Sequence, residues 1–325
     1  MMTIKISSDR PGFDYLRQTP GSKGVWDDCQ FIVNRECPEC DWWVICEGVK
    51  TKEHTKVPKD HTILITAEPP GLKQYQPGFL NQFGVVITAH QDLRHPNVIN
   101  AQQALPWWVG VRMRGVEMLS YSKGYDELKA MDATTFKKEK CLSVISSNVA
   151  YMEGHRRRTE FAKALKSHFG DRINSFGRGL QDIEDKWDAI SPYKYHIAIE
   201  NTSCPHYWTE KLSDAFLGCA YPFYYGCPNL EEYFPKGAFT RIEIRDVEGS
   251  IDTIEKAIES RVYEKTVADI NRCRELVLDK YNLFPMLAEL CNNRGAGERP
   301  IGKVVRPEAS FGRLKMWTGR QMGRG

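Results

Sequence analysis

The residues best suited to chemistry lie in the stretch 193–226, where a strand, a polar loop, a helix and a second strand follow one another. Thr209 is a suitable N-cap, so Glu210 and Lys211 fall in the first turn of the helix. Unpaired N–H groups and the helix dipole favour a phosphate there, Lys211 adds positive charge, and Glu210 can accept hydrogen bonds from a ribose. The pattern predicts a nucleotide pocket at the carboxyl end of a strand. The spacing is equally typical of an ordinary acidic first turn beside an exposed lysine.

A second polar cluster surrounds Ser147. A strand is expected to end near Ser146, and Arg156, Arg157 and Arg158 open the helix that follows the loop. Successive helical residues point about 100° apart, so one or two of these arginines can face a single ligand. A guanidinium can hold a diphosphate with two parallel hydrogen bonds. The alternative is a solvated basic helix start, but its mild conflict with the helix dipole favours an anionic partner.

Glu68 follows an apolar strand and is succeeded by Pro69 and Pro70. A carboxylate at the end of a rigid strand is well placed to act as a general base. Taken alone, a Glu-Pro-Pro sequence is more often simply a turn. His90 and His95 flank a later turn, where an acceptor-side role and a packing role both stay open.

Metal-binding patterns are weak in this sequence. Cys37 and Cys40 form one C-x-x-C pair, whereas a zinc site normally needs a second pair or suitably spaced histidines. Asp27 and Asp28 are adjacent and do not form the spaced acidic pair of a metal-dependent sugar transferase. We therefore expect no metal and no other cofactor, and we expect the 10 cysteines to be free thiols.

Strands that alternate with helices are needed to position these residues. Apolar, β-rich runs predict strands over residues 3–6, 42–46, 62–66, 85–88, 141–146, 173–176, 193–199, 220–225 and 239–244. Amphipathic spacing predicts helices around 161–169 and 212–219, a helix over 251–281 interrupted near Arg261, and a short helix over 283–291. This alternation predicts the α/β class, with two Rossmann-like domains built on parallel sheets.

The length of 325 residues also favours two domains. The composition turns polar at 124–140, so we predict a first domain over 1–132 and a second over 133–293. The remaining 294–325 is Gly-rich and carries eight Lys and Arg residues against two Glu. It is expected to be a solvated tail, with peripheral contact to anionic lipid as the rival interpretation.

Hydrophobic residues make up 41% of the chain, which is enough for a substantial core and excludes wholesale disorder. We find no apolar run of about 18 residues and no signal peptide, so a cytoplasmic protein is expected, with the inner face of the membrane as a further location. The sequence pI of about 8.2 argues against a broad basic face for nucleic acid.

The stretch 193–226 resembles the signature of the α-1,3-fucosyltransferases, glycosyltransferase family 10. The resemblance rests on Ile199-Glu200-Asn201-Thr202, on Tyr207-Trp208-Thr209-Glu210-Lys211, and on a Pro-bearing strand that ends at Gly226. Upstream, residues 144–165 are similar to a Val-Ser-Asn loop followed by an arginine that opens a helix, and this arginine corresponds best to Arg158. The resemblance is strong over 141–234 and traceable from 62 to 110.

This resemblance implies a GT-B fold, in which two Rossmann-like domains face a central cleft, with the acceptor in the first domain and the nucleotide sugar in the second. It implies that Arg158 and Lys211 hold the diphosphate, that Glu210 holds the ribose, that Asn201 and Tyr207 line the donor pocket, and that Glu68 is the catalytic base. We also assign Ser147 and Glu200 to the donor pocket, and His90 and His95 to the acceptor side. Pro69 stands where the family has Ser, which is a departure beside the base.

The expected function is inverting, metal-independent transfer of fucose from GDP-fucose to a hydroxyl of a GlcNAc-containing glycan. One alternative keeps the fold with another nucleotide-sugar donor or another glycan acceptor. A second alternative is a protein that binds nucleic acid or a membrane surface. The sequence shows neither the amino-terminal membrane anchor of eukaryotic members nor the heptad repeats of some bacterial ones, so a soluble bacterial-type enzyme is expected.

Overall fold

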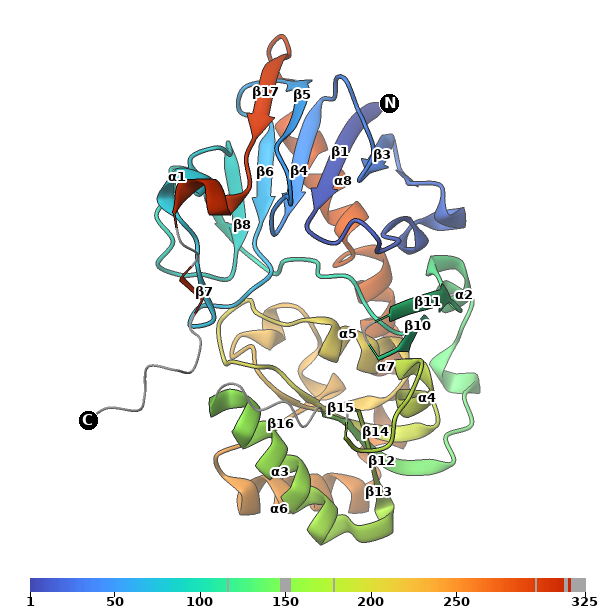
Figure 1. Cartoon of the computed structure of the whole chain (residues 1–325). Coiled ribbons are helices and arrows are strands. Elements are labelled where there is room, and N and C mark those ends of the chain that lie inside the picture. Colours follow the sequence, from blue (N-terminus) through green and yellow to red (C-terminus); the bar gives the residue numbers. More distant parts are fainter. Residues whose placement is uncertain (116, 147–152, 178, 296, 313–314, 317–325) are drawn as a thin grey trace, which may run out of the picture. The chain divides into compact units, whose positions relative to one another are not determined.

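The computed structural model divides the chain into two compact units, which we describe separately (Figure 1). The structure describes all residues except 116, 147–152, 178, 296, 313–314 and 317–325. The N-terminal unit contains residues 1–106, 204–207 and 281–316, and the C-terminal unit contains residues 107–203 and 208–280. Neither unit is therefore one continuous piece of the sequence.

The N-terminal unit is built on a sheet with the strand order β2-β3-β1-β4-β6-β8-β9. All neighbouring pairs are parallel except β2 with β3. The central strands are short apolar runs covered on both faces, as parallel strands require. Their bounds are β1 Met2–Ser8, β2 Val25–Trp26, β3 Cys29–Val33, β4 Trp42–Cys46, β6 Thr62–Ile65, β8 Val85–Thr88 and β9 Val98–Asn100.

The C-terminal unit is built on a fully parallel sheet with the order β13-β12-β14-β15-β16. Its strands are β12 Lys140–Ile145, β13 Ile173–Phe176, β14 Tyr193–Ile199, β15 Tyr221–Tyr225 and β16 Thr240–Arg241. Its helices are α2 Tyr125–Lys129, α3 Glu153–Phe169, α4 Lys186–Ile190, α5 Glu210–Leu217, α6 Val247–Glu259 and α7 Val262–Asp279. The predicted α/β architecture is confirmed, and the predicted interruption falls at Arg261, which has a left-handed backbone (φ 53°) between α6 and α7.

The predicted boundary at residue 132 is wrong, because the structure divides the chain after residue 106. A hairpin of β10 (Val111–Arg114) and β11 (Glu117–Tyr121) and helix α2 belong to the C-terminal unit. Arg274 on α7 ties α2 to that unit by donating to the carbonyl oxygen of Leu128 at 2.5 Å. The polar composition of 124–140 therefore reflects a partly exposed connection within one unit and does not mark a linker.

The prediction of a solvated tail from residue 294 is wrong for the part that the structure describes. Strand β17 (Ile301–Val305) pairs antiparallel with β5 (Glu53–Val57), and the two lie side by side in Figure 1. Val305 is fully buried, and Glu308 is buried and forms an ion pair with Lys73 at 2.9 Å. The charged composition concealed this segment because only a few of its side chains face inward.

Helix α8 (Leu283–Arg294) also belongs to the N-terminal unit, although the sequence assigned residues up to 293 to the second domain. Leu283, Phe284 and Leu287 are buried, and Phe284 packs edge-on against Phe31 of β3. The remaining short elements of this unit are α1 (Pro77–Leu80) and the pair β7 (Lys73–Gln74) with β18 (Lys315–Met316). In the described ranges, no helix is long and apolar enough to cross a lipid bilayer.

Candidate functional site

The strand order of the C-terminal unit creates a ligand crevice between β12 and β14. The chain leaves β12 through α3 toward β13 on one side, and it leaves β14 through α5 toward β15 on the other. Ligands of open α/β sheets bind where the connections diverge in this way, outside the carboxyl ends of the strands. A pocket of about 190 Å³ extends from this edge, and Ser146, Arg158, Glu210 and Lys211 are among the residues that line it.

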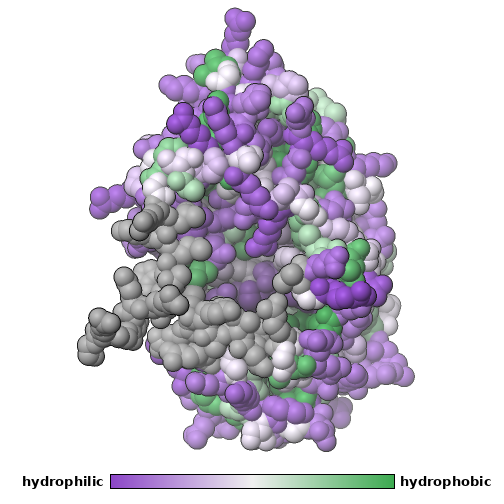
Figure 2. Space-filling view, viewed as in Figure 1, coloured by the Kyte–Doolittle hydropathy of each residue, from purple (hydrophilic) through white to green (hydrophobic). Residues whose placement is uncertain are grey.

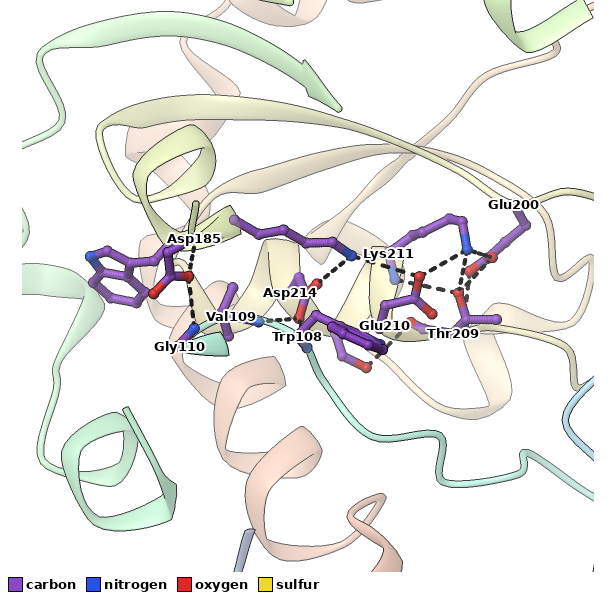
Figure 3. Close-up of polar contacts among 12 residues, drawn as sticks. Trp108, Val109, Gly110, Asp185, Glu200, Thr209, Glu210, Lys211 and Asp214 are labelled. Carbon is purple, nitrogen blue, oxygen red and sulfur yellow. Dashed lines mark hydrogen bonds and ion pairs between the residues drawn. The ribbon is translucent and has the colours of Figure 1, made fainter. Parts of the chain in front are cut away.

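The start of α5 is fixed by a buried carboxylate. Thr209 is the N-cap, and its hydroxyl accepts from the backbone N–H of Lys211 at 3.3 Å. Glu200, directly after β14, accepts from the Thr209 N–H at 2.8 Å and from the Thr209 hydroxyl at 2.7 Å (Figure 3). Glu200 is 1% exposed, so both of its oxygens hold the loop that leads into the helix. The helix start is thereby presented in a fixed position.

Lys211 is held between two carboxylates. Its ammonium lies 3.1 Å from Glu210 Oε1 and 3.5 Å from Glu200 Oε2. Burial lowers the pKa of Lys211, but the two carboxylates outweigh burial and raise it above its ordinary value. Burial raises the pKa of Glu210, but Lys211 and then Lys186 outweigh it and hold it well below its ordinary value. The side chain of Lys211 is therefore positively charged at neutral pH, and it lies in the first turn of α5.

Arg158 brings a second cation to the same pocket from α3. Its Nη1 donates to Asn201 Oδ1 at 2.9 Å, which links the helix after β12 to the loop after β14. Burial lowers the pKa of Arg158, and the nearby carboxylates of Glu200 and Glu210 oppose that effect. The structure thus brings together Arg158, Asn201, Glu200, Glu210 and Lys211. Ser147 lies outside the described residues, and so does the side chain of Arg156.

Ser146 and Gly177 shape the other wall of the crevice. The Ser146 hydroxyl is buried, lines the pocket and has no hydrogen-bond partner among the described residues. Gly177 has a positive φ of 118°, and a Cβ atom at this position would lie 2.2 Å from the Ser146 carbonyl oxygen. Glycine is therefore required where the chain after β13 passes the end of β12. A buried hydroxyl that lacks a partner is available to a polar ligand.

Lys186 and Asp214 also line the pocket, and the sequence analysis missed both. Lys186 Nζ lies 3.0 Å from Asp214 Oδ2 and 3.7 Å from Glu210 Oε1. Asp214 also accepts from the backbone N–H groups of Trp108 (2.8 Å) and Val109 (3.0 Å), as Figure 3 shows. The available signal was the four-residue spacing of Glu210 and Asp214, which places both carboxylates on one face of α5.

Tyr207 does not join this cluster. Residues 204–207 belong to the N-terminal unit, where Tyr207 is buried in a small apolar cluster with Ala89 and Cys204. The thiol of Cys204 donates to the Ala89 carbonyl oxygen at 3.3 Å, just beyond the end of β8. The expected place of Tyr207 in the second domain is therefore corrected, because an aromatic ring in a short loop is stabilised by whichever apolar surface covers it.

In the N-terminal unit, Glu68 lies three residues after β6 and is half-buried. The ring Nε2 of His90 lies 2.9 Å from the Glu68 carbonyl oxygen. A carbonyl can only accept, so His90 donates through Nε2 and supports the backbone of the Glu68 turn. Burial lowers the pKa of His90, which favours the neutral ring. The two residues that the sequence placed on this side of the reaction are therefore in direct contact.

Glu47, directly after β4, organises the neighbourhood of this turn, and no local pattern in the sequence indicated its role. It accepts from the Ala67 N–H at 2.6 Å, the Tyr75 hydroxyl at 2.7 Å and the Lys73 ammonium at 2.5 Å. The Tyr75 ring in turn packs edge-on against His90. Burial lowers the pKa of Lys73, but the carboxylates of Glu47 and Glu308 outweigh burial and raise this pKa above its ordinary value. The turn that carries Glu68 therefore rests on a connected polar network.

His95 and the C-x-x-C pair have local partners. The two ring nitrogens of His95 lie 3.0 Å from the Phe83 carbonyl oxygen and 3.2 Å from that of Asn97, so its ring stabilises its own turn. Cys37 and Cys40 are buried free thiols, and burial raises the pKa of Cys40 to about 12. Within the described ranges, no group of three or more His, Cys, Asp or Glu residues is arranged to hold a metal ion.

The two units define a class of protein. The chain has a GT-B fold, the fold of a large class of glycosyltransferases, with a Rossmann-like sheet in each unit. It is similar to an α-glucosyltransferase solved in complex with UDP and a DNA duplex, with a TM-score of 0.51 and 8% identity over 90% of this chain and 100% of that one. An α1,3-fucosyltransferase solved with GDP-fucose aligns with a TM-score of 0.48 and 16% identity over 83% of this chain and 82% of that one.

Sequence comparison points to a family for part of the chain. Residues 135–256, which include the crevice, match the model of glycosyltransferase family 10 (fucosyltransferase), C-terminal part. The α-(1,3)-fucosyltransferase FucT of Helicobacter pylori is 29% identical over 101 residues, which cover 28% of this chain and 21% of that protein. A putative fucosyltransferase-like protein of Arabidopsis thaliana is 35% identical over 82 residues, covering 24% and 16%. The alignments thus span about a fifth of the length of these relatives.

Proposed function

We propose that this protein transfers fucose from GDP-fucose to a hydroxyl of a GlcNAc-containing glycan, with inversion at the anomeric carbon. The observation that carries the proposal is the convergence of Arg158 and Lys211, from the two helices that diverge at the β12/β14 crevice. The match of residues 135–256 to a fucosyltransferase family supports the donor assignment. Glu210 lies in the same helix turn, where its carboxylate can accept from the ribose hydroxyls.

In this proposal the acceptor hydroxyl attacks the anomeric carbon while Glu68 removes its proton, and the bond to the GDP oxygen breaks. Negative charge then grows on the departing diphosphate. Arg158 and Lys211 are the groups that stabilise it, together with the N–H groups at the start of α5. Ser146, whose buried hydroxyl lines the pocket, can donate a further hydrogen bond to a phosphate oxygen.

We also propose that no resident metal ion is needed, because Arg158 and Lys211 line one pocket and can supply positive charge to the leaving group. In other sugar transferases a divalent ion supplies this charge. The support for the proposal is that the side chains of Arg158 and Lys211 are both partly buried and line the same pocket.

A donor screen tests the function directly. The purified chain is incubated with GDP-fucose, GDP-mannose, UDP-glucose and UDP-GlcNAc, each with N-acetyllactosamine as acceptor and with or without EDTA, and release of the nucleotide is measured. We expect release only with GDP-fucose, at the same rate in EDTA. Turnover of a UDP-sugar alone would contradict the donor assignment, and a requirement for Mn²⁺ or Mg²⁺ would contradict metal independence. The anomeric configuration of the product, determined by NMR, tests inversion.

A further inference from the structure

The N-terminal unit has a crevice of the same topological origin as the donor crevice. Its strand order β3-β1-β4 places the first strand between its two successors, so the connections from β1 and β4 diverge as those from β12 and β14 do. A pocket of about 500 Å³ lies there, within the size range of small-molecule sites. Its lining includes Ser8 at the end of β1, Asn34 just after β3, residues 50–52 of the loop that follows β4, and the first two residues of β5.

The pocket is electropositive. Its lining contains Lys5, Arg35, Lys50 and Lys52, but only two carboxylates, Glu36 and Glu53. Arg35, Lys50 and Lys52 are exposed, and in the part of the chain that the structure describes none of them forms an ion pair. Hydrophilic residues dominate the face of this unit seen in Figure 2, where hydrophobic residues are scattered.

The floor of the pocket holds a buried cation. Lys5 is 3% exposed and extends from the middle of β1, where its ammonium lies 3.2 Å from Glu53 Oε2 and 4.5 Å from the centre of the Trp43 ring. Ser7 donates to the same Glu53 oxygen at 2.7 Å and accepts from Trp43 Nε1 at 3.0 Å. Glu53 thus forms an ion pair with Lys5 at the pocket. The charges of Arg35, Lys50 and Lys52 are left for a ligand.

We propose that this pocket binds an anionic substituent, a carboxylate, sulfate or phosphate, on the saccharide acceptor. The inference rests on the proposed function and names its substrate class as acidic glycans. Only β4 separates β1 from β6, the strand that leads to Glu68, so the two strand ends are about 10 Å apart. A disaccharide can span that distance, with its reacting hydroxyl at Glu68 and its charged group in the pocket. None of the residues given for its lining belongs to a helix, so their side chains supply the positive charge.

Binding of three matched saccharides to the full chain saturated with GDP tests the proposal. The probes are N-acetyllactosamine, its 3′-sialyl derivative and its 6-phosphate, with affinity measured by calorimetry at 50 and 300 mM salt. We expect the two charged probes to bind about tenfold more tightly than the neutral one at low salt, and less so at high salt. Comparison of the carboxylate with the phosphate identifies the preferred group.

Two double variants separate the pocket from general surface charge. Arg35→Glu with Lys52→Glu reverses two lining charges, whereas Lys56→Glu with Lys59→Glu reverses two exposed charges outside the lining. The first pair should abolish the preference for charged probes, and the second should retain it. Equal binding of charged and neutral probes by the unmodified chain, or loss of the preference in both pairs, overturns the proposal. GDP-fucose turnover with the neutral acceptor is measured separately, so a failure of the proposed function is distinguished from a failure of this pocket.

Discussion

Lys211 is the residue on which the donor site depends most. Without a ligand it compensates Glu210 and Glu200, and a bound diphosphate would compete with these carboxylates for the same ammonium. Arg158 differs because it donates to the neutral side chain of Asn201. A diphosphate in this crevice would therefore compete with carboxylates for Lys211 and with a neutral amide oxygen for Arg158.

We expect Arg158→Ala and Lys211→Ala each to lower kcat/KM by about 10²- to 10³-fold, because each removes a charge-assisted contact to the leaving group. Steady-state kinetics with GDP-fucose measures the effect, and circular dichroism checks folding. Lys163→Ala, which alters an exposed position on the same helix as Arg158, is the control and should leave kcat/KM unchanged. Near-normal turnover in both pocket variants would contradict the diphosphate assignment.

Glu68→Gln tests the proposed base. The amide keeps the size of the side chain but cannot take the acceptor proton, so kcat should fall by about 10²- to 10⁴-fold. GDP affinity, measured by calorimetry, should stay the same because the nucleotide crevice is in the other unit. Glu39→Gln, which changes an exposed acid of the N-terminal unit outside the lining of the basic pocket, serves as the matched control. Unchanged kcat in Glu68→Gln would mean that another group removes the proton.

Residues whose role depends on their own turn could be predicted from the sequence, and residues whose partners are distant could not. Thr209 and Lys211 follow from the local chemistry of a helix start. Lys186 donates a hydrogen bond to Asp214, which is 28 residues away in the sequence, and Lys73 donates one to Glu47, which is 26 residues away. No local spacing in the sequence predicts these long-range contacts, because they form only when the sheets bring the residues together.

At the scale of elements, the start of α5 is positioned by β14 through Glu200. Glu200→Gln leaves one acceptor oxygen for two donors of Thr209, so we expect the free energy of unfolding to fall by about 1–3 kcal/mol. GDP affinity should fall as well, because the helix start is no longer held. Urea unfolding and calorimetry measure the two effects. Glu248→Gln changes an exposed acid in the first turn of α6 and should alter neither; a Glu200→Gln protein as stable as the parent would exclude the positioning role.

The C-terminal segment is a second element whose role can be measured. Glu308 accepts from the Gln76 N–H and pairs with Lys73, each at 2.9 Å. Glu308→Ala should lower the free energy of unfolding by about 1–3 kcal/mol, because a partly buried N–H group and a partly buried ammonium lose a partner. Glu298→Ala, at an exposed position of the same segment, should have almost no effect. If chemical unfolding gave equal stabilities for the two variants, the segment would contribute nothing through Glu308.

At the scale of the whole molecule, acid stability reflects a buried histidine in the C-terminal sheet. His196 is 3% exposed, and its Nδ1 lies 2.8 Å from the Ser143 hydroxyl. Burial lowers the pKa of His196 to about 3 from an ordinary value of 6.5. Between these values the unfolded chain binds a proton that the folded chain does not, so stability is lost as the pH falls below 6.5.

Urea unfolding at pH 7, 6 and 5 should therefore show an advantage of the parent over His196→Gln that shrinks by about 1.4 kcal/mol for each pH unit below 6.5. His54→Gln replaces an exposed histidine, and its curve should run parallel to that of the parent. A parallel curve for His196→Gln would show that this ring does not remain neutral in the folded chain.

The fold class could be predicted from the sequence, but the boundary between the two units could not. Alternating strand and helix patterns are local, and they correctly indicated two Rossmann-like sheets. The boundary and the tail were misplaced because contacts far apart in sequence decide them: α2 is held by Arg274, and β17 pairs with a strand about 250 residues earlier. Composition reports how polar a segment is, but it does not report which surface the segment covers.

The N-terminal unit is assembled from separate stretches of the sequence, and this determines the order in which the two units can fold during synthesis. Its sheet begins to emerge first from the ribosome, yet α8 and β17, which cover and extend it, are translated only after residue 281. The described part of the C-terminal unit is fully translated by residue 280. The unit that begins the chain is thus the last to finish folding, and during that interval the surfaces that later receive Phe284 and Val305 are exposed to chaperones and proteases.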